Sequence, residues 1–132
     1  MPKGAAMESY GATVLRLCLG SIYVMHAYAA LFELGPAGVA AFQRHHGIPF
    51  PEVGAWYLIL AHGIGGICLL LGVLARWAAL VNVPVMAGAV FFVHLHQGFF
   101  MGKDGGQEYA LLVLGATIAQ AFLGAGAFTF RK

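Results

Sequence analysis

The chain has 132 residues, of which 61% are hydrophobic and 9% are charged. A soluble domain carries roughly a quarter charged residues, because its surface must be wetted by water. This composition therefore excludes an ordinary soluble domain, and lipid is the solvent that fits it. The formal charge of +2 is too small and too scattered to indicate a nucleic-acid interface.

Four apolar stretches follow one another along the chain, each of roughly 20 residues. At a rise of about 1.5 Å per residue, such a helix matches a hydrocarbon core about 30 Å thick. The backbone in lipid must bond to itself, so each stretch is predicted to be a helix. We therefore expect an all-α, integral membrane four-helix bundle, forming a single transmembrane domain over residues 1–132. The expected helices span approximately 10–34, 53–74, 77–97 and 109–128.

The three links differ in length. The first, residues 35–52, is the only long one, and its part 37–44 favours a short interfacial helix ended by glycine and prolines. The second is little more than Ala75–Arg76, which predicts a tight antiparallel hairpin. The third, residues 98–108, is rich in glycine.

Basic residues predict how the chain is oriented. Four crossings put both termini and the second link on one side of the membrane. That side carries more basic residues, so the positive-inside rule predicts that both termini lie in the cytoplasm. The basic residues are Lys3, Arg76, Arg131 and Lys132 on this side, and Arg44 and Lys103 on the other.

Several ionisable residues lie at membrane depth, where each is costly and suggests a function. Counted from the helix ends, they fall in the outer half of the same bundle. His94 and His96 are two residues apart and diverge by about 200° on a helix, so we expect only one to face inward. The set is His26, His62, His94, His96 and Glu108.

The chemistry of this set remains open from the residues alone. Imidazoles with a carboxylate could exchange protons with a quinol, ligate haem or bind a transition metal. The metal alternative would use His26, His94, His96 and Glu108. Equally, the same side chains could hydrogen-bond between helices and to lipid headgroups.

Two further features lie nearer the cytoplasmic side. Arg16 falls about 9 Å inside the boundary and is expected to snorkel to the headgroups. The alternatives are a contact with Asn82 or Gln120, or with an anionic or quinone headgroup. Cys18 and Cys68 are expected to be small, buried thiols, and the sequence leaves open whether they meet.

Motifs spread from about Thr13 to Phe130 resemble the DoxX family of small bacterial membrane proteins. The resemblance implies a four-helix fold in a bacterial inner membrane, and it points to Arg16, His26, His94 and Glu108 as shared residues. The family includes subunits of thiosulfate–quinone oxidoreductases. Two departures are Ala30, where a lysine is usual, and His62, where a glutamate is common. The matching motifs are Arg16-x-x-x-Gly20, His26, Leu31–Phe32, Gly47–Ile48–Pro49, Gly65–Gly66, Leu69–Gly72, Arg76, His94, Gly98–Phe99–Phe100 and Gly105–Gly106-x-Glu108–Tyr109–Ala110–Leu111.

These observations favour a membrane subunit of a redox system that exchanges quinone or quinol, or that anchors a partner oxidoreductase. Whether the chain is itself an enzyme stays open. The main alternative is a structural or assembly subunit without chemistry of its own. A metal or haem site and a small-molecule transporter are further alternatives, and a homo-oligomer is compatible with each. The candidate quinone or polar-centre residues are Arg16, His26, His62, His94 and Glu108.

Overall fold

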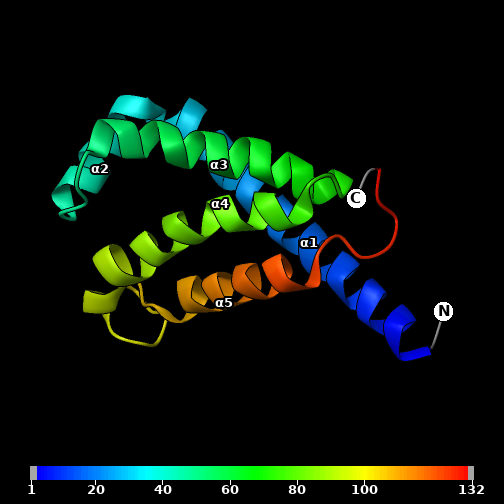
Figure 1. The fold of residues 1–132 in the computed structure, drawn as a ribbon. Coiled ribbons are helices and arrows are strands. Elements are labelled where there is room, and N and C mark those ends of the chain that lie inside the picture. Colours follow the sequence, from blue (N-terminus) through cyan, green and yellow to red (C-terminus); the bar gives the residue numbers. More distant parts are fainter. Residues whose placement is uncertain (1–2, 131–132) are drawn as a thin grey trace.

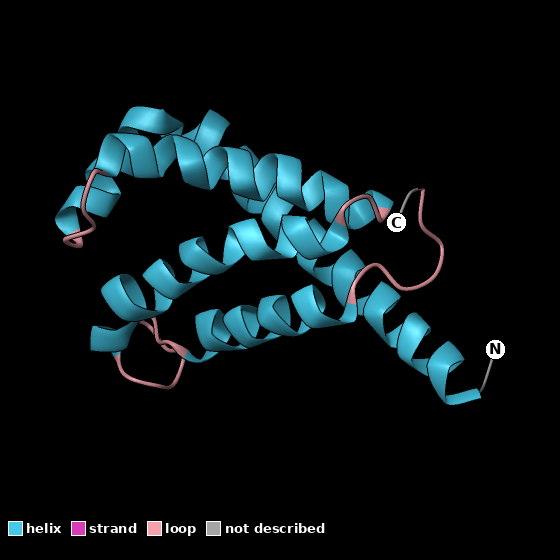
Figure 2. Ribbon diagram, viewed as in Figure 1, coloured by secondary structure: helices cyan, strands magenta, loops and turns pink. Residues whose placement is uncertain are grey.

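The computed structural model describes residues 3–130, which contain helices and loops but no strand (Figures 1 and 2). The expected all-α class with four apolar helical stretches is confirmed. Arg131 and Lys132, which entered the orientation prediction, lie outside the described residues. The helices are α1 (Lys3–Tyr28), α2 (Gly35–His45), α3 (Pro51–Leu71), α4 (Ala75–Gly88) and α5 (Glu108–Leu123), with π-helical segments η1 (Ala29–Leu34) and η2 (Ala89–His94) and a short 3₁₀ segment η3 (Leu95–Gln97).

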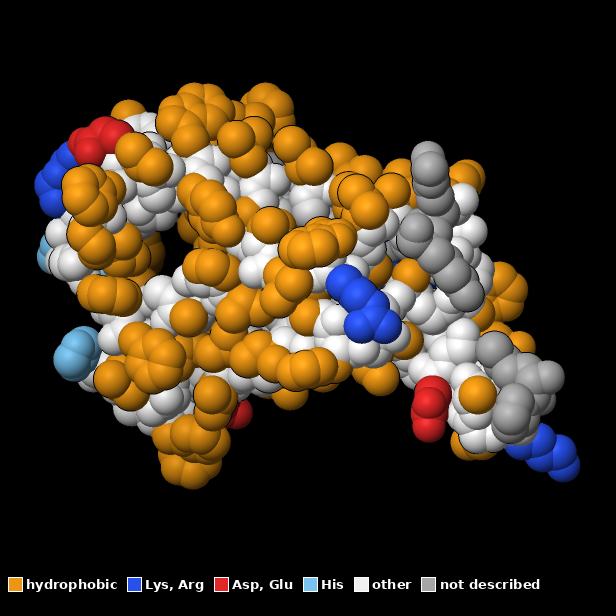
Figure 3. All heavy atoms as spheres, viewed as in Figure 1, with side chains coloured by type: hydrophobic (Ala, Val, Ile, Leu, Met, Phe, Trp, Pro, Cys, Tyr) orange, Lys and Arg blue, Asp and Glu red, His pale blue; other side chains and the backbone are white. Residues whose placement is uncertain are grey.

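Length and composition of the helices fit a multi-pass membrane protein. Three helical stretches, Lys3–His45, Pro51–Leu71 and Ala75–Gln97, are long and apolar enough to cross a bilayer. The fourth, α5, has 16 residues and is about 24 Å long, shorter than a typical hydrocarbon core. On the face drawn in Figure 3, hydrophobic side chains cover the middle and most charged ones lie toward the two ends.

The helices are arranged as two packed groups. Helix α1 packs along α3, α2 packs on α3, and α4 packs along α5. Figure 1 shows the two groups diverging toward one end of the bundle. We call this the open end; it carries α2 and the loop 98–107. The closed end carries the α3–α4 turn, residues 124–130 and the start of α1 (Figure 1). Which membrane face each end meets stays a prediction.

Glycines let α1 and α3 approach closely. A Cβ added to Gly20 would lie 2.9 Å from the carbonyl oxygen of Gly66, and one added to Gly66 would lie 3.0 Å from the backbone nitrogen of Val24. Small residues at such crossings are typical of helix pairs in lipid, where packing rather than water exclusion drives association.

The tight hairpin lies slightly earlier in the chain than expected. Helix α3 ends at Leu71 instead of Leu74, and α4 begins at Ala75 instead of Trp77. Gly72, at φ 72°, ends α3, and the N–H of Val73 donates to the carbonyl of Cys68 at 2.9 Å. This Schellman arrangement satisfies carbonyls of the last helical turn. The predicted link at Ala75–Arg76 is therefore wrong by a few residues.

The last helix is shorter than predicted. It ends at Leu123, not at residue 128, and Gly124 and Gly126 follow with φ 79° and 75°. The segment 124–130 turns back across the closed end: the N–H of Ala127 donates to the carbonyl of Ser9, and that of Phe130 to the carbonyl of Leu71. Two glycines in left-handed conformations allow this reversal at little steric cost.

Candidate functional site

Arg16 lies in the closed end, not at the membrane surface. Its side chain is 1% exposed, so the expectation that it snorkels to the headgroups is wrong. A guanidinium has five N–H donors, and here each makes one hydrogen bond to a backbone carbonyl. Nε donates to Ala125 at 2.7 Å, Nη1 to Leu69 and Leu70 at 2.9 Å each, and Nη2 to Ala127 and Phe128 at 2.7 Å each.

This Arg16 cluster, the guanidinium and its five carbonyl acceptors, has a structural explanation. Near the end of α3, the carbonyl of Leu69 accepts the N–H of Gly72 at 3.2 Å and can accept a second hydrogen bond, and the end of a helix dipole attracts positive charge. The carbonyls of residues 125, 127 and 128 lack helical partners because the chain has left α5. Arg16 supplies donors to both groups at once. No N–H of Arg16 is left over for a ligand.

A cavity of about 300 Å³ lies toward the open end, between the two helix groups. Its walls come from α1, α2, α3, α4, η2 and α5, together with the loop residue Ile48. Figure 3 shows a hollow on the surface where the groups diverge. Most lining side chains are apolar, among them Ile22, Leu58, Val85, Met86 and Val113.

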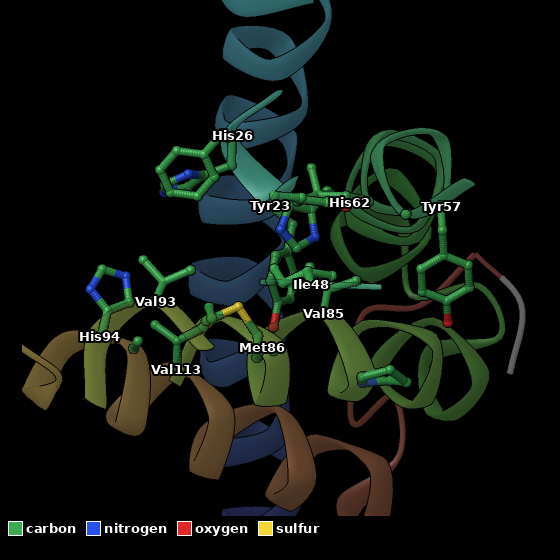
Figure 4. A pocket seen from close by; sticks show the side chains of 18 of the residues that line it. Tyr23, His26, Ile48, Tyr57, His62, Val85, Met86, Val93, His94 and Val113 are labelled. Carbon is green, nitrogen blue, oxygen red and sulfur yellow. The ribbon is translucent and has the colours of Figure 1, made fainter. Parts of the chain in front are cut away.

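Three of the predicted histidines line this cavity: His26 from α1, His62 from α3 and His94 from η2 (Figure 4). His62 is 5% exposed, and its ring stacks on Tyr23 with the centroids 4.6 Å apart. The ring of His26 meets it edge-on at 6.4 Å. The structure thus brings together three of the five ionisable residues that were expected in one region of the bundle.

Asn82 positions the ring of His62. It is fully buried in α4, and its Oδ1 lies 2.6 Å from His62 Nδ1. Its Nδ2 donates to the carbonyls of Ala61 and Ala78, both at 2.9 Å. Sequence reasoning weighed Asn82 only as a contact for Arg16; the signal for a role of its own was an amide inside an apolar helix.

His94 is half-buried at the other wall of the cavity. Its Nδ1 lies 2.7 Å from Gln97 Oε1, which also accepts the backbone N–H of Gly106 at 3.1 Å. Gln97 therefore connects the histidine to the loop 98–107.

Besides Arg16, two more predicted residues lie outside this cavity. His96 is exposed and does not line it. Glu108 is exposed as well, and its Oε2 accepts the N–H of Met101 at 2.8 Å, which holds the loop against the start of α5. Across residues 3–130, no three His, Cys, Asp or Glu side chains gather closely enough to hold a metal ion. The metal set of His26, His94, His96 and Glu108 is therefore not brought together.

Gln43 is a lining residue that the sequence prediction missed, because it falls in the first link. It is 5% exposed, and its Oε1 has no hydrogen-bonding partner among the described residues. Its amide lies against Gly54, where a Cβ would overlap it. A buried, unpaired amide oxygen is costly in an apolar wall unless a ligand or water meets it.

The two cysteines are free. Cys18 is exposed on α1, whereas Cys68 is half-buried on α3. The expectation that both are buried is therefore wrong for Cys18, which faces outward from the helix.

A helical, multi-pass membrane protein with a histidine-lined cavity between its helices is the class that this fold and site define. Comparison with family models gives the particular family: the DoxX model matches residues 11–95, more than half of the chain. The chain belongs to the DoxX family, and the resemblance inferred from its motifs is confirmed. Searches of the curated proteins and of the solved structures found no match.

Proposed function

We propose that this DoxX-family membrane protein binds the ring of a quinone or quinol in the cavity lined by His26, His62 and His94. It would do so as the membrane subunit of a redox system that includes a partner oxidoreductase. The observation that carries the proposal is the convergence of three imidazoles on one apolar cavity of about 300 Å³.

The walls of the cavity support a ring ligand. Small-molecule sites are mostly apolar, with a few polar groups that fix orientation, and volumes start near 300 Å³. Apolar side chains such as Val85, Met86 and Val113 can enclose a ring. Imidazole nitrogens can meet its oxygen substituents, as donors to a carbonyl or as acceptors from a hydroxyl. A ligand dissolved in lipid would also reach a cavity between membrane helices without crossing water.

The candidate residues now fall into two groups. His26, His62 and His94 would contact the ring. Arg16 would support the fold, because all its donors are used, and Glu108 would hold the loop 98–107 in place. This division assigns Glu108, which was expected beside the histidines, to the loop and keeps Arg16 apart from the cavity.

A titration with a matched pair of histidine variants tests the proposal. The purified protein in lipid nanodiscs is titrated with a short-tailed benzoquinone and its quinol, and the dissociation constants are measured calorimetrically. His94→Ala removes a lining imidazole, so we expect at least one of the two ligands to bind about tenfold more weakly. His96→Ala, two residues along the chain and outside the cavity, should leave both constants unchanged.

Equal constants for wild type and His94→Ala would refute this site. Unchanged ligand binding by every variant, together with loss of a co-purifying oxidoreductase, would favour the assembly subunit instead. A separate mild-detergent preparation from native membranes shows which partner subunits and quinone accompany the protein, and its absorption spectrum would reveal haem.

We propose the cytoplasm for the closed end and for both termini, in a bacterial inner membrane. The support is the excess of basic residues on that side, including Lys3 and Arg76. Reporter fusions at the C-terminus and in the loop at Lys103 test it. A reporter active only in the cytoplasm should work at the C-terminus and fail at Lys103; the reverse pattern would contradict the orientation.

A further inference from the structure

The amide of Asn82 determines which nitrogen of His62 carries the proton. Its Nδ2 has two hydrogens, and both are given to carbonyls, those of Ala61 and Ala78. The remaining atom facing His62 Nδ1, at 2.6 Å, is therefore the acceptor Oδ1. The histidine must donate from Nδ1, since an amide oxygen only accepts. In neutral His62 the lone pair is then on Nε2.

The same reasoning applies to His94 at the opposite wall. Gln97 accepts the backbone N–H of Gly106, and a backbone N–H only donates, so the accepting atom is the amide oxygen Oε1. That oxygen also lies 2.7 Å from His94 Nδ1. Neutral His94 therefore donates from Nδ1 and keeps its lone pair on Nε2.

The hydroxyl groups of two lining tyrosines also already donate their protons to partners within the protein. The hydroxyl of Thr117 donates to the carbonyl of Val113 at 2.6 Å, so in its pair with Tyr23 the tyrosine is the donor. Tyr57 donates its hydroxyl proton to the carbonyl of Val81 at 2.6 Å. Both phenol oxygens can now only accept.

The groups in this cavity whose roles are set by these hydrogen bonds are therefore all acceptors. The residues still free to donate are His26, Tyr109 and the Nε2 of Gln43, none of which has a hydrogen bond within residues 3–130 that fixes its role. An apolar wall with fixed lone pairs favours a ligand that brings its own O–H groups.

We propose that the cavity selects the reduced, hydroxyl-bearing form of its ring ligand, a quinol rather than a quinone, through the Nε2 atoms of His62 and His94. This inference rests on the proposed function. A quinol donates from its hydroxyls to these acceptors. A quinone presents only carbonyl lone pairs, which cannot pair with the Nε2 lone pairs of His62 and His94.

Three ligands with the same ring and tail test the selectivity: the quinol, the quinone and the dimethyl ether of the quinol. Affinities are measured anaerobically on the full-length protein in nanodiscs. We expect the quinol to bind at least about tenfold more tightly than either other ligand. His62→Gln, which introduces an amide donor, should reduce this preference to about threefold or less, whereas His96→Gln should leave it unchanged.

Nitrogen-15 NMR of labelled histidine tests directly which ring nitrogen of His62 and His94 carries the proton. His62 and His94 should show the Nδ1–H tautomer in the ligand-free protein. The Nε2–H tautomer at both, or equal affinities for quinol and quinone, would overturn the selectivity and leave the proposed function standing. Binding of none of the three ligands would overturn the proposed function and this inference with it.

Discussion

Arg16 at the closed end and the polar side chains around the cavity at the open end differ in how completely they are paired. At the closed end, Arg16 is almost fully buried and each of its N–H groups has a carbonyl partner, although the buried Oε1 of Gln120 nearby has none. At the open end, Gln43 is buried with an unpaired oxygen, and His62 bonds through Nδ1 alone. Full pairing makes a buried polar network a structural element, whereas unpaired groups around a cavity suggest that a ligand completes them. We therefore expect substitutions at the closed end to affect stability, and those at the open end to affect binding.

The largest expected effect is the loss of Arg16. Arg16→Ala would leave five carbonyls without their charged donor in a water-free region, and we expect a loss of about 3 kcal/mol or more in the free energy of unfolding. Chemical unfolding in detergent, followed by circular dichroism, measures it. Arg16→Lys keeps the charge but has three donors and no planar fork, so its stability should be intermediate.

Arg76→Gln is the matched control for charge. Arg76 is exposed and makes a single long bond, 3.5 Å to the carbonyl of Ala121. We expect a change within about 0.5 kcal/mol. If Arg16→Ala proved as mild as Arg76→Gln, the Arg16 cluster would not stabilise the closed end.

A smaller loss is expected at the chain reversal. Gly126 has φ 75°, and an added Cβ would lie 2.9 Å from the backbone nitrogen of Thr13. Gly126→Ala should cost about 2 kcal/mol, from backbone strain and from displacing a segment that bonds to Arg16. Gly11→Ala, where a Cβ meets nothing within 4 Å, should be neutral or slightly stabilising. Similar unfolding midpoints for the two variants would contradict the close packing of residues 124–130.

Substitutions at the open end should change the affinity for quinol rather than the stability of the fold. Gly88 lines the cavity, and a Cβ there would meet nothing within 4 Å. Gly88→Leu should fill part of the cavity and weaken quinol binding about tenfold while changing stability by less than about 1 kcal/mol. Gly115→Leu is the control, because Gly115 also has open space but lies on α5 away from the cavity. Equal binding by both variants would place the ligand elsewhere.

The sequence predicted the helical class well, because hydrophobic runs of membrane length leave few alternatives. It also predicted that His26, His62 and His94 lie in the same region, since their depths can be counted from the helix ends. The prediction that Arg16 snorkels to the headgroups was wrong. Its acceptors are backbone carbonyls of residues 53 to 112 positions away. Backbone atoms carry no signal in composition, so such a cluster is visible only in three dimensions.

The end of α5 and the role of Gln43 were missed for different reasons. Apolar residues continue past Leu123, so hydropathy extended the helix, although Gly124 and Gly126 were available as stop signals. Gln43 lies in α2, which packs on α3 and so brings the first link into the cavity wall. Depth counted along membrane helices cannot place a residue of such a connecting helix.

Photoaffinity labelling tests the central claim, that the histidine-lined cavity binds a quinone-type ring, most directly. A short-tailed azidoquinol is photolysed with the full-length protein in nanodiscs, with and without excess unlabelled quinol, and the labelled residues are identified by mass spectrometry. We predict competable labelling of cavity residues such as His62, Met86 and Val113, which is lost in Gly88→Leu and retained in Gly115→Leu. Labelling confined to lipid-facing residues, or insensitive to competition, would contradict the account.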